Sequence, residues 1–268
     1  MTIQRWLIDA TTTLVEAGVP SARLDALVLL SDELGQTKAQ LLAHDDESLS
    51  QEQFDSLEMK LQRRTAREPI AYIRGHQEFY GRDFALTPEV LIPRPETETL
   101  VELLETLDVE QLPTLVDIGT GSGAIAITAK LEHPDWHVIA TDVSEGALDV
   151  ARDNASRLGA DVSFLSGSLL EALAEPVDII AANLPYVDQA WERFSPETDY
   201  EPALALFADN NGLQLIYDLL DQAPSYLNEN GFILLEADPE QHDAIISYAK
   251  TKSLQHTTTE GYIVVLTR

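Results

Sequence analysis

The sequence predicts an α/β fold built on an open, mostly parallel β-sheet, and three observations indicate it. From residue 114 onward, short apolar runs alternate with longer segments of helical periodicity, which is the rhythm of βαβ units. A glycine-rich turn follows the first of these runs, and an acidic residue ends the second. In such a doubly wound sheet, helices cover both faces and ligands bind beyond the carboxyl ends of the strands.

The composition leaves room for one large domain and a small one. The chain has 268 residues, 44% of them hydrophobic, and it has no cysteine, which excludes disulfides, thiolate metal sites and a thiol nucleophile. No run of 18 apolar residues predicts a membrane span, and the amphipathic start differs from a signal peptide. We expect a monomeric cytoplasmic enzyme without a metal site and without contact with a membrane.

The net charge of −29 argues against nucleic acid as a partner. Acidic residues number 46 against 17 basic ones, so the chain repels phosphate backbones. The closest approach to a basic run lies at residues 60–67, where the spacing favours the exposed face of a helix over a nucleic-acid track.

Residues 1–74 predict a small helical bundle. Apolar residues recur at helical spacing, and Gly18 and Gly35 separate the first segments. Thr37 begins a short helix, and Ser50 is placed to cap a longer one. No chemistry is visible in this part of the chain, so we interpret it as a substrate-docking domain.

Residues 75–93 predict a hairpin linker, because glycines and a proline punctuate short apolar pieces. The catalytic domain follows at residues 94–268 and begins with Arg94 held between two prolines. Two roles fit Arg94 equally well: it pins the hairpin to the sheet, or it faces the mouth of the active site.

The catalytic domain predicts strands and helices in alternation. Strands are expected at 114–119, 137–142, 162–166, 177–183, 231–237 and 262–267. Helices are expected near 122–131, 144–158, 212–227 and 239–251. A further strand candidate at 254–258 is separated from the last strand by Glu260 and Gly261, which predicts a closing antiparallel hairpin.

The glycine-rich turn is a candidate cofactor site. It consists of Gly119, Thr120, Gly121, Ser122 and Gly123. Glycines let a ligand approach the backbone, and Asp142, nineteen residues beyond Gly123, can accept hydrogen bonds from both hydroxyls of a ribose. The same spacing satisfies the dinucleotide fingerprint, so an NAD-dependent dehydrogenase is an alternative.

A second candidate site is the tetrad Asn183, Leu184, Pro185 and Tyr186, which ends the apolar run from Val177. Carbonyl oxygens there can accept the two hydrogens of a flat NH2 group while the ring lies against its face. Taken alone, a plain strand-to-loop turn explains the tetrad equally well. The glycine-rich turn upstream favours the functional interpretation.

Four candidate segments follow predicted strand ends. They are Gly119–Gly123, Asp142, Ser168–Leu169 and Asn183–Tyr186. Because parallel strands present their carboxyl ends at one edge of a sheet, we expect all four segments to converge there.

Together these motifs resemble those of the protein-(glutamine-N5) methyltransferases that act on peptide chain release factors. The resemblance spans nearly the whole chain and rests on the strings at 67–72, 91–98, 117–126, 183–186 and 200–202. It implies a class I methyltransferase fold and S-adenosylmethionine as cofactor. It also implies methyl transfer to the glutamine side-chain amide in the Gly-Gly-Gln loop of release factors, which tunes translation termination.

The resemblance assigns roles residue by residue. The turn from Gly119 to Gly123 holds the amino-acid and sugar portions of the cofactor, Asp142 takes the ribose, and Ser168 with Leu169 lies near the adenine. The Asn183 side chain, next to the cofactor, and the Leu184 carbonyl accept the substrate's amide hydrogens, with Pro185 and Tyr186 completing the site.

The sequence departs from the family pattern in two segments. Ser168 and Leu169 stand where the family usually has an acid followed by a large side chain, and Leu184 stands where it usually has proline. The Leu184 contact is made by a backbone carbonyl, which leucine retains.

Three alternatives accompany this prediction. Amino-methyltransferases of DNA and RNA share the tetrad, although the charge of −29 and the missing basic groove argue against them. A dehydrogenase leaves the tetrad unexplained. A noncatalytic binding protein is the third alternative, and the departures at Ser168 and Leu184 keep it open.

Overall fold

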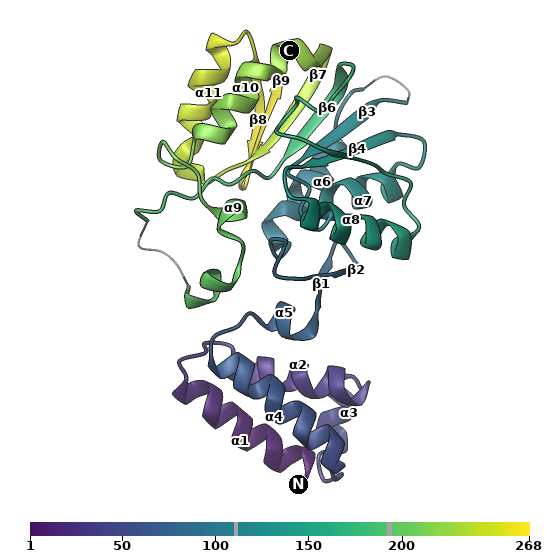
Figure 1. Ribbon diagram of the computed structural model, residues 1–268, viewed down its shortest axis with the longest axis vertical. Helices are drawn as coiled ribbons and strands as arrows, with labels where there is room; N and C mark the ends of the chain where they lie inside the picture. The colour runs from purple at the N-terminus through teal and green to yellow at the C-terminus, as the bar shows by residue number, and fades with distance from the viewer. Residues whose placement is uncertain (110–111, 192–194) are drawn as a thin grey trace. The chain divides into compact units, whose positions relative to one another are not determined.

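The computed structural model describes residues 1–109, 112–191 and 195–268 (Figure 1). The chain divides into two compact units. The first holds residues 1–75 together with residues 195–200, and the second holds the rest of the described chain. The polypeptide therefore leaves the second unit after the tetrad and returns to it at Glu201.

The first unit is the helical bundle that the sequence predicts. Its elements in the described residues are α1 (Ile3–Glu16), α2 (Ala22–Leu34), α3 (Lys38–Ala43), α4 (Gln51–Thr65), α5 (Ile70–Arg74) and the 3₁₀ turn η2 (Pro196–Tyr200). Thr37 and Ser50 each close a capping box at a helix start, as expected, and α2 ends at Gly35 in the left-handed conformation. Trp6 and Leu57 are fully buried in the core.

The exposed helix face that we expected at residues 60–67 is wrong for Arg64. This arginine is 5% exposed and pairs with Asp25 at 2.7 Å and with Glu197 at 3.0 Å. Its acidic partners come from α2 and from a segment 133 residues away in sequence, so the local pattern does not reveal them. A buried arginine needs such partners, because an unpaired charge in the core is costly.

Glu197 ties η2 to the rest of the first unit. Arg67 donates to both of its carboxylate oxygens at 2.8 Å, and Tyr200 Oη donates to the Ala66 carbonyl at 2.6 Å. Burial works to raise the pKa of Glu197, but hydrogen bonds from Arg67, Ser195 and Arg64 outweigh it and lower the pKa to about 2. The carboxylate is therefore ionised whenever the protein is folded near neutral pH.

The second unit is built on a seven-stranded sheet with strand order β5-β4-β3-β6-β7-β9-β8 (Figure 1). The strands are β3 (Thr114–Ile118), β4 (His137–Asp142), β5 (Ser163–Ser166), β6 (Val177–Ala182), β7 (Leu227–Glu236), β8 (Gln255–Glu260) and β9 (Ile263–Thr267). Strands β3 to β7 pair in parallel, whereas β9 pairs antiparallel with β7 and β8. The predicted sheet and its closing hairpin are confirmed, and β1 (His76–Phe79) with β2 (Arg82–Ala85) forms the earlier predicted hairpin.

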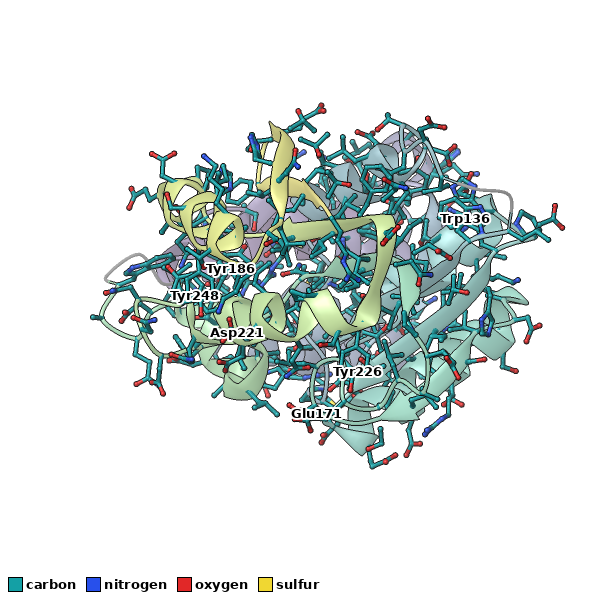
Figure 2. All side chains as sticks on the ribbon, turned by 90° about the horizontal axis from the view of Figure 1, so that it is seen from above. Trp136, Glu171, Tyr186, Asp221, Tyr226 and Tyr248 are labelled. Atoms are coloured by element: carbon teal, nitrogen blue, oxygen red, sulfur yellow. The ribbon has the colours of Figure 1, made fainter. Side chains whose placement is uncertain are left out.

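Helices cover both faces of this sheet, with α6 (Glu98–Leu104), α7 (Ala124–Glu132) and α8 (Glu145–Leu158) on one face and α10 (Gln214–Tyr226) and α11 (His242–Thr251) on the other (Figure 1). The described residues of this unit also form η1 (Pro95–Thr97), α9 (Ala203–Leu206) and η3 (Pro239–Gln241). On the outside of the layer formed by α10 and α11, Tyr248 Oη donates to Asp221 Oδ1 at 2.9 Å (Figure 2). None of the described helices is both long and apolar enough to cross a membrane.

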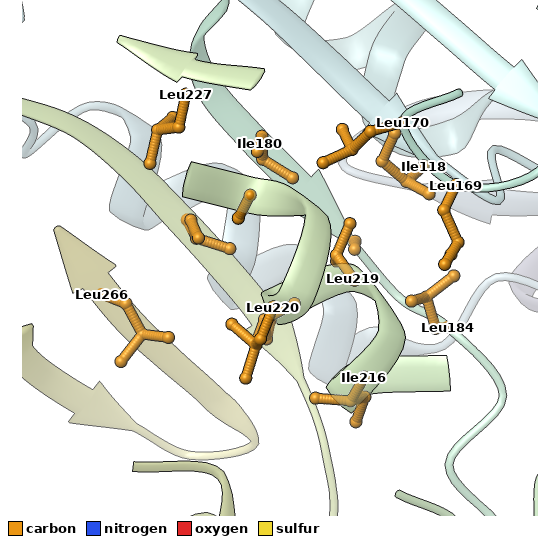
Figure 3. Close-up of a cluster of buried hydrophobic side chains, with 14 of the residues drawn as sticks. Ile118, Leu169, Leu170, Ile180, Leu184, Ile216, Leu219, Leu220, Leu227 and Leu266 are labelled. Carbon is orange, nitrogen blue, oxygen red and sulfur yellow. The ribbon is translucent and has the colours of Figure 1, made fainter. Parts of the chain in front are cut away.

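Side chains that alternate along the strands pack into two separate core layers, one on each face of the sheet. Leu115 of β3 packs with α6 and α7, whereas Val116 and Ile118 pack with α10 and α11. Figure 3 shows part of the second layer, in which Leu219 and Leu220 of α10 lie against the strands. Burying such a leucine fully contributes about 1.5–3 kcal/mol, so both layers hold the strand ends in a fixed arrangement.

Strand β7 begins four residues earlier than the predicted start at residue 231. Leu227 pairs with Val177, after which the register shifts and Phe232 pairs with Ile179. The intervening residues 228–230 are polar and exposed. The start of this strand could not be predicted from hydrophobic periodicity, because residues in a bulge need not be buried and these three are polar.

Candidate active site

The four candidate segments lie at the carboxyl ends of four adjacent strands. Gly119–Gly123 follows β3, Asp142 ends β4, Ser168–Leu169 follows β5 and Asn183–Tyr186 follows β6. Because these strands pair in parallel in the order β5-β4-β3-β6, the segments share one edge of the sheet. The convergence that we expected from the sequence is therefore present in the fold.

The glycine turn folds back onto the end of β4. Gly119, Gly121 and Gly123 have φ values of 70°, 54° and 83°, in the left-handed region that favours glycine. The N–H groups of Gly119 and Thr120 both donate to the Thr141 carbonyl at 2.9 Å. A Cβ on Gly121 would meet nothing within 4 Å, so this position leaves open space for a ligand.

Thr120 and Ser122 of the turn are buried. The Thr120 hydroxyl donates to Asp117 Oδ2 at 2.6 Å, and the Ser122 backbone carbonyl accepts from Asn154 Nδ2 at 2.9 Å. The turn therefore leaves room and backbone groups for a ligand, while the Thr120 hydroxyl is engaged by a buried carboxyl group.

Asp117 is a fully buried carboxylic acid beneath the turn. Its Oδ2 accepts hydrogen bonds from Thr120 and from the Ala126 N–H, whereas its Oδ1 has no hydrogen-bond partner among the described residues. Burial raises the pKa of Asp117 to about 7. The two hydrogen bonds act to lower this pKa, and the nearby Asp142 charge acts to raise it.

Asp142 is held rigidly and still has accepting capacity. Its Oδ2 accepts from the Gly121 N–H at 3.0 Å and its Oδ1 from the Ser144 N–H at 2.9 Å. Each carboxylate oxygen has a further lone pair. Asp142 and the open space at Gly121 thus fit a nucleoside whose ribose hydroxyls donate to the carboxylate.

Ser168 and Leu169 differ in what they offer a ligand. Ser168 is exposed, whereas Leu169 is 7% exposed and packs in the apolar cluster with Ile118 and Leu184 (Figure 3). Leu169 adopts a φ of 50°, which is uncommon for a residue with a Cβ. At this strand end the wall beside the glycine turn is therefore apolar, and the exposed hydroxyl of Ser168 is its polar group.

The tetrad presents two unengaged acceptors. Asn183 Nδ2 donates to Thr97 Oγ1 at 3.1 Å. In the part of the chain that the structure describes, no hydrogen bond engages Asn183 Oδ1 or the Leu184 carbonyl. The Leu184 side chain packs over the glycine turn, with its Cδ2 3.3 Å from where a Cβ of Gly119 would lie.

Tyr186 is fixed at both ends. Its carbonyl accepts from Gln241 Nε2 at 2.8 Å, and Gly212 approaches so closely that a Cβ there would lie 1.9 Å from the same oxygen. Its hydroxyl donates to Glu236 Oε1 at 3.2 Å. Burial, followed by the Glu236 charge, raises the pKa of the Tyr186 hydroxyl, which therefore stays protonated.

Sequence reasoning missed two residues of this site, Thr97 and Glu236. Thr97 Oγ1 donates to Glu236 Oε2 at 2.7 Å, and both side chains are buried. Burial, followed by the nearby Glu96 charge, raises the pKa of Glu236, while hydrogen bonds from Thr97, Tyr186 and the Asn183 side chain oppose that change. A signal was available, because Glu236 ends an apolar strand in the same way as Asp142 does.

Arg94 pairs with a buried acid. Its Nη2 lies 2.5 Å from Oε1 of Glu201, whose side chain is 2% exposed, and the Ile92 N–H donates to the other carboxylate oxygen at 3.3 Å. The positive charge of Arg94 also acts to lower the pKa of Tyr186. Arg94 thus anchors the stretch before η1 beside the tetrad.

No group of three or more metal-ligating side chains occurs among the residues that the structure describes.

Comparison with known proteins identifies two matching family models. The PrmC N-terminal domain matches residues 5–75, and the methyltransferase small domain matches residues 97–195. The release factor glutamine methyltransferase of Deinococcus radiodurans is 37% identical over 257 residues, which cover 95% of this chain and 92% of that protein. The protein of the same name from Enterococcus faecalis is 41% identical over 214 residues, covering 79% and 77%.

Solved structures share the fold. A methyltransferase from Pyrococcus furiosus superposes with a TM-score of 0.54 at 18% identity, over 70% of this chain and 90% of that one. The hMettl16 catalytic domain gives a TM-score of 0.57 at 12% identity, over 80% and 79%. The predicted class I methyltransferase fold is confirmed.

The pKa of Asp117 predicts how stability changes with pH. Folding raises this pKa from an ordinary value of 3.8 to about 7, so between these values the folded chain holds a proton that the unfolded chain releases. The stabilisation by that proton is complete below about pH 4 and is lost as the pH rises through about 7. Each unit by which the pKa is raised corresponds to about 1.4 kcal/mol.

Asp117→Asn keeps an acceptor for Thr120 and removes the charge. We expect the free energy of unfolding of this variant, relative to that of the unsubstituted protein, to rise between about pH 4 and pH 7. Urea denaturation of the ligand-free proteins measures it. A difference that is constant across this range contradicts the raised pKa.

Proposed function

Because the chain belongs to the release factor glutamine methyltransferase family, we propose that it methylates the side-chain amide nitrogen of a glutamine in a peptide chain release factor. The methyl donor is S-adenosylmethionine. The glutamine is that of the Gly-Gly-Gln loop, and its methylation tunes translation termination.

One observation of the site carries this proposal. Asn183 Oδ1 and the Leu184 carbonyl belong to consecutive residues, and neither accepts a hydrogen bond from the described residues. A primary amide has two N–H donors on one nitrogen, and it needs two acceptors to fix its orientation. This pair of acceptors matches that need, and the Tyr186 ring stands two residues further on.

These acceptors address the central difficulty of the reaction. An amide nitrogen is a poor nucleophile, because its lone pair is delocalised into the carbonyl. Accepting both hydrogens orients the nitrogen and increases its electron density. Alignment of this kind can supply roughly 7–11 kcal/mol in favourable cases. S-adenosylmethionine, when bound, supplies an electrophilic methyl group on a sulfonium.

Residues of the other strand ends fit the donor. Asp142 has free lone pairs for the ribose hydroxyls, Gly121 leaves room for close approach, and Leu169 provides an apolar wall for a flat base. The Leu184 side chain packs against Gly119, so the acceptor for the substrate and the cradle for the donor are neighbours.

The alternatives are less well supported. Membership of a methyltransferase family excludes the dehydrogenase. For a nucleic-acid substrate, the basic run would have to bind phosphates, but Arg64 and Arg67 are engaged by Asp25 and Glu197 within the first unit. The noncatalytic alternative is addressed by the Asn183 and Leu184 variants below.

We propose that the enzyme acts as a monomer in the cytoplasm, where release factors work. One chain contains both the acceptor pair and the donor cradle, so no second copy is needed to complete the described site. We expect no direct contact with nucleic acid.

We propose that the first unit docks the release factor. It matches the PrmC N-terminal domain, and its described residues contain no cluster of metal-ligating side chains. Helix α1 carries two exposed apolar side chains, Ile8 and Val15, which are 50% and 61% exposed and seven residues apart. This spacing places them on one helix face, available to a protein partner.

The double variant Ile8→Asp/Val15→Asp tests docking. We expect KM for whole release factor to rise about 10-fold or more, with kcat and cofactor affinity unchanged, because the chemistry lies in the other unit. Leu112→Asp is the control, since Leu112 is 68% exposed and precedes the amino end of β3, away from the site. An unchanged KM in the double variant would show that this face does not dock the substrate.

Asp142→Ala tests the donor site. We expect S-adenosylmethionine binding to weaken by about 1.5–3 kcal/mol, the usual contribution of hydrogen bonds to a charged group. Isothermal calorimetry measures it. Asp149→Ala removes an equal charge from the exposed face of α8 and should leave the affinity unchanged. Equal affinity in the two variants would remove Asp142 from the site, and tight NAD binding would overturn the class.

Asn183→Ala and Leu184→Pro test the acceptor pair. We expect Asn183→Ala to lower single-turnover methyl transfer by about 100-fold or more, with cofactor affinity far less affected. Leu184→Pro keeps the carbonyl and stiffens the turn, so the rate should be retained, although loss of the buried side chain lowers stability by about 1–3 kcal/mol.

Tandem mass spectrometry of the methylated release factor locates the added group in this experiment. A full rate in Asn183→Ala would contradict the role of the side chain. Inactive but folded Leu184→Pro would show that the tetrad is not built around the carbonyl at position 184.

A further inference from the structure

Three side chains from separate elements form one hydrogen-bond chain beneath the acceptor pair. Asn183 Nδ2 at the end of β6 donates to Thr97 Oγ1 of η1 at 3.1 Å, and Thr97 Oγ1 donates to Glu236 Oε2 at the end of β7 at 2.7 Å. Thr97 is 4% exposed and Glu236 is 2% exposed. Water therefore does not compete for these bonds, and their direction is set by the side chains themselves.

The Glu236 carboxyl group fixes the direction of this chain. It accepts at both oxygens, from Thr97 Oγ1 at Oε2 and from Tyr186 Oη at Oε1, so the Thr97 hydroxyl gives its hydrogen to Glu236. The Thr97 oxygen then has only lone pairs to offer Asn183. The Asn183 amide must therefore turn its NH2 toward Thr97, and its Oδ1 is left for the substrate.

We propose that Glu236 and Thr97 are positioning residues, which select the atom of the Asn183 amide that faces the substrate. This inference rests on the proposed function, in which Asn183 Oδ1 accepts a hydrogen of the glutamine amide. If the amide were turned over, its NH2 would face the NH2 of the substrate, and no hydrogen bond would form between them.

Glu236 also holds the other end of the tetrad. Its second oxygen, Oε1, accepts from Tyr186 Oη at 3.2 Å, so one carboxylate fixes both Asn183 and Tyr186. Burying a carboxylate is costly, and glutamine would fill nearly the same volume. A glutamine amide can present either oxygen or NH2 to Thr97, however, so only the carboxylate makes the direction of the chain unambiguous.

The test measures single-turnover methyl transfer to release factor, together with KM for release factor and calorimetric cofactor affinity. We expect Thr97→Val and Glu236→Gln to lower the rate about 10- to 100-fold, which is the effect of losing one strong hydrogen bond. Cofactor affinity and KM for release factor should change less than about 3-fold, because neither docking nor the donor cradle is altered.

Two matched variants control the test. Thr97→Ser keeps the hydroxyl, and it should restore the rate to within about 3-fold of the unsubstituted protein. Thr128→Val makes the same isosteric change at a buried threonine of α7 whose hydroxyl has no hydrogen-bond partner among the described residues. It should leave the rate unchanged, so a loss in Thr97→Val cannot be ascribed to removal of a buried hydroxyl in general.

The outcomes separate this inference from the proposed function. If the unsubstituted protein transfers no methyl group to release factor, the proposed function fails. If it does, and either Thr97→Val or Glu236→Gln binds cofactor normally and transfers methyl at the full rate, the positioning role is overturned. A loss in Thr97→Ser equal to that in Thr97→Val also overturns it, because the hydroxyl would then not be the active feature.

Discussion

Parallel pairing of β3 to β7 is the constraint from which the rest of the catalytic unit follows. It brings the carboxyl ends of five strands to one edge, so residues from 119 to 236 in the sequence become neighbours without any one loop having to carry them all. The two core layers then hold those ends still, because alternate side chains of each strand are committed to helices on opposite faces. The residues that we propose for donor and substrate are thereby placed by the sheet itself, which is more rigid than a loop.

At that edge, two carboxylates differ in burial and in partners, and these differences suit them to different roles. Asp142 keeps free lone pairs toward open space, which suits the hydroxyls of a ribose. Glu236 is buried and accepts hydrogen bonds from Thr97 and Tyr186. Such a carboxylate is suited to fixing the side chains that orient the substrate amide. Asp117 is the third acid, and burial raises its pKa, with no cation among the described residues opposing that change. The same side chain chemistry thus serves binding, orientation and fold, according to exposure and partners.

Much of this could be predicted from local pattern. Periodicity located the strands, capping residues located helix starts at Thr37 and Ser50, and glycines located the turn after β3. The sequence did not reveal contacts that depend on tertiary pairing, such as Arg64 with Glu197 or Thr97 with Glu236, whose members lie more than 130 residues apart. The start of β7 was not predicted for another reason: its polar, exposed residues show no hydrophobic periodicity.

The central claim is that Asn183 turns its oxygen to the substrate because a carboxylate fixes the opposite side. Neutron diffraction from a perdeuterated crystal, grown with S-adenosylhomocysteine and a glutamine peptide, locates the deuterium atoms directly. The account predicts deuterium on the Asn183 atom that faces Thr97, deuterium from Thr97 directed at Glu236, and a bare Asn183 oxygen facing the glutamine amide. Deuterium on the Asn183 atom that faces the substrate would contradict it.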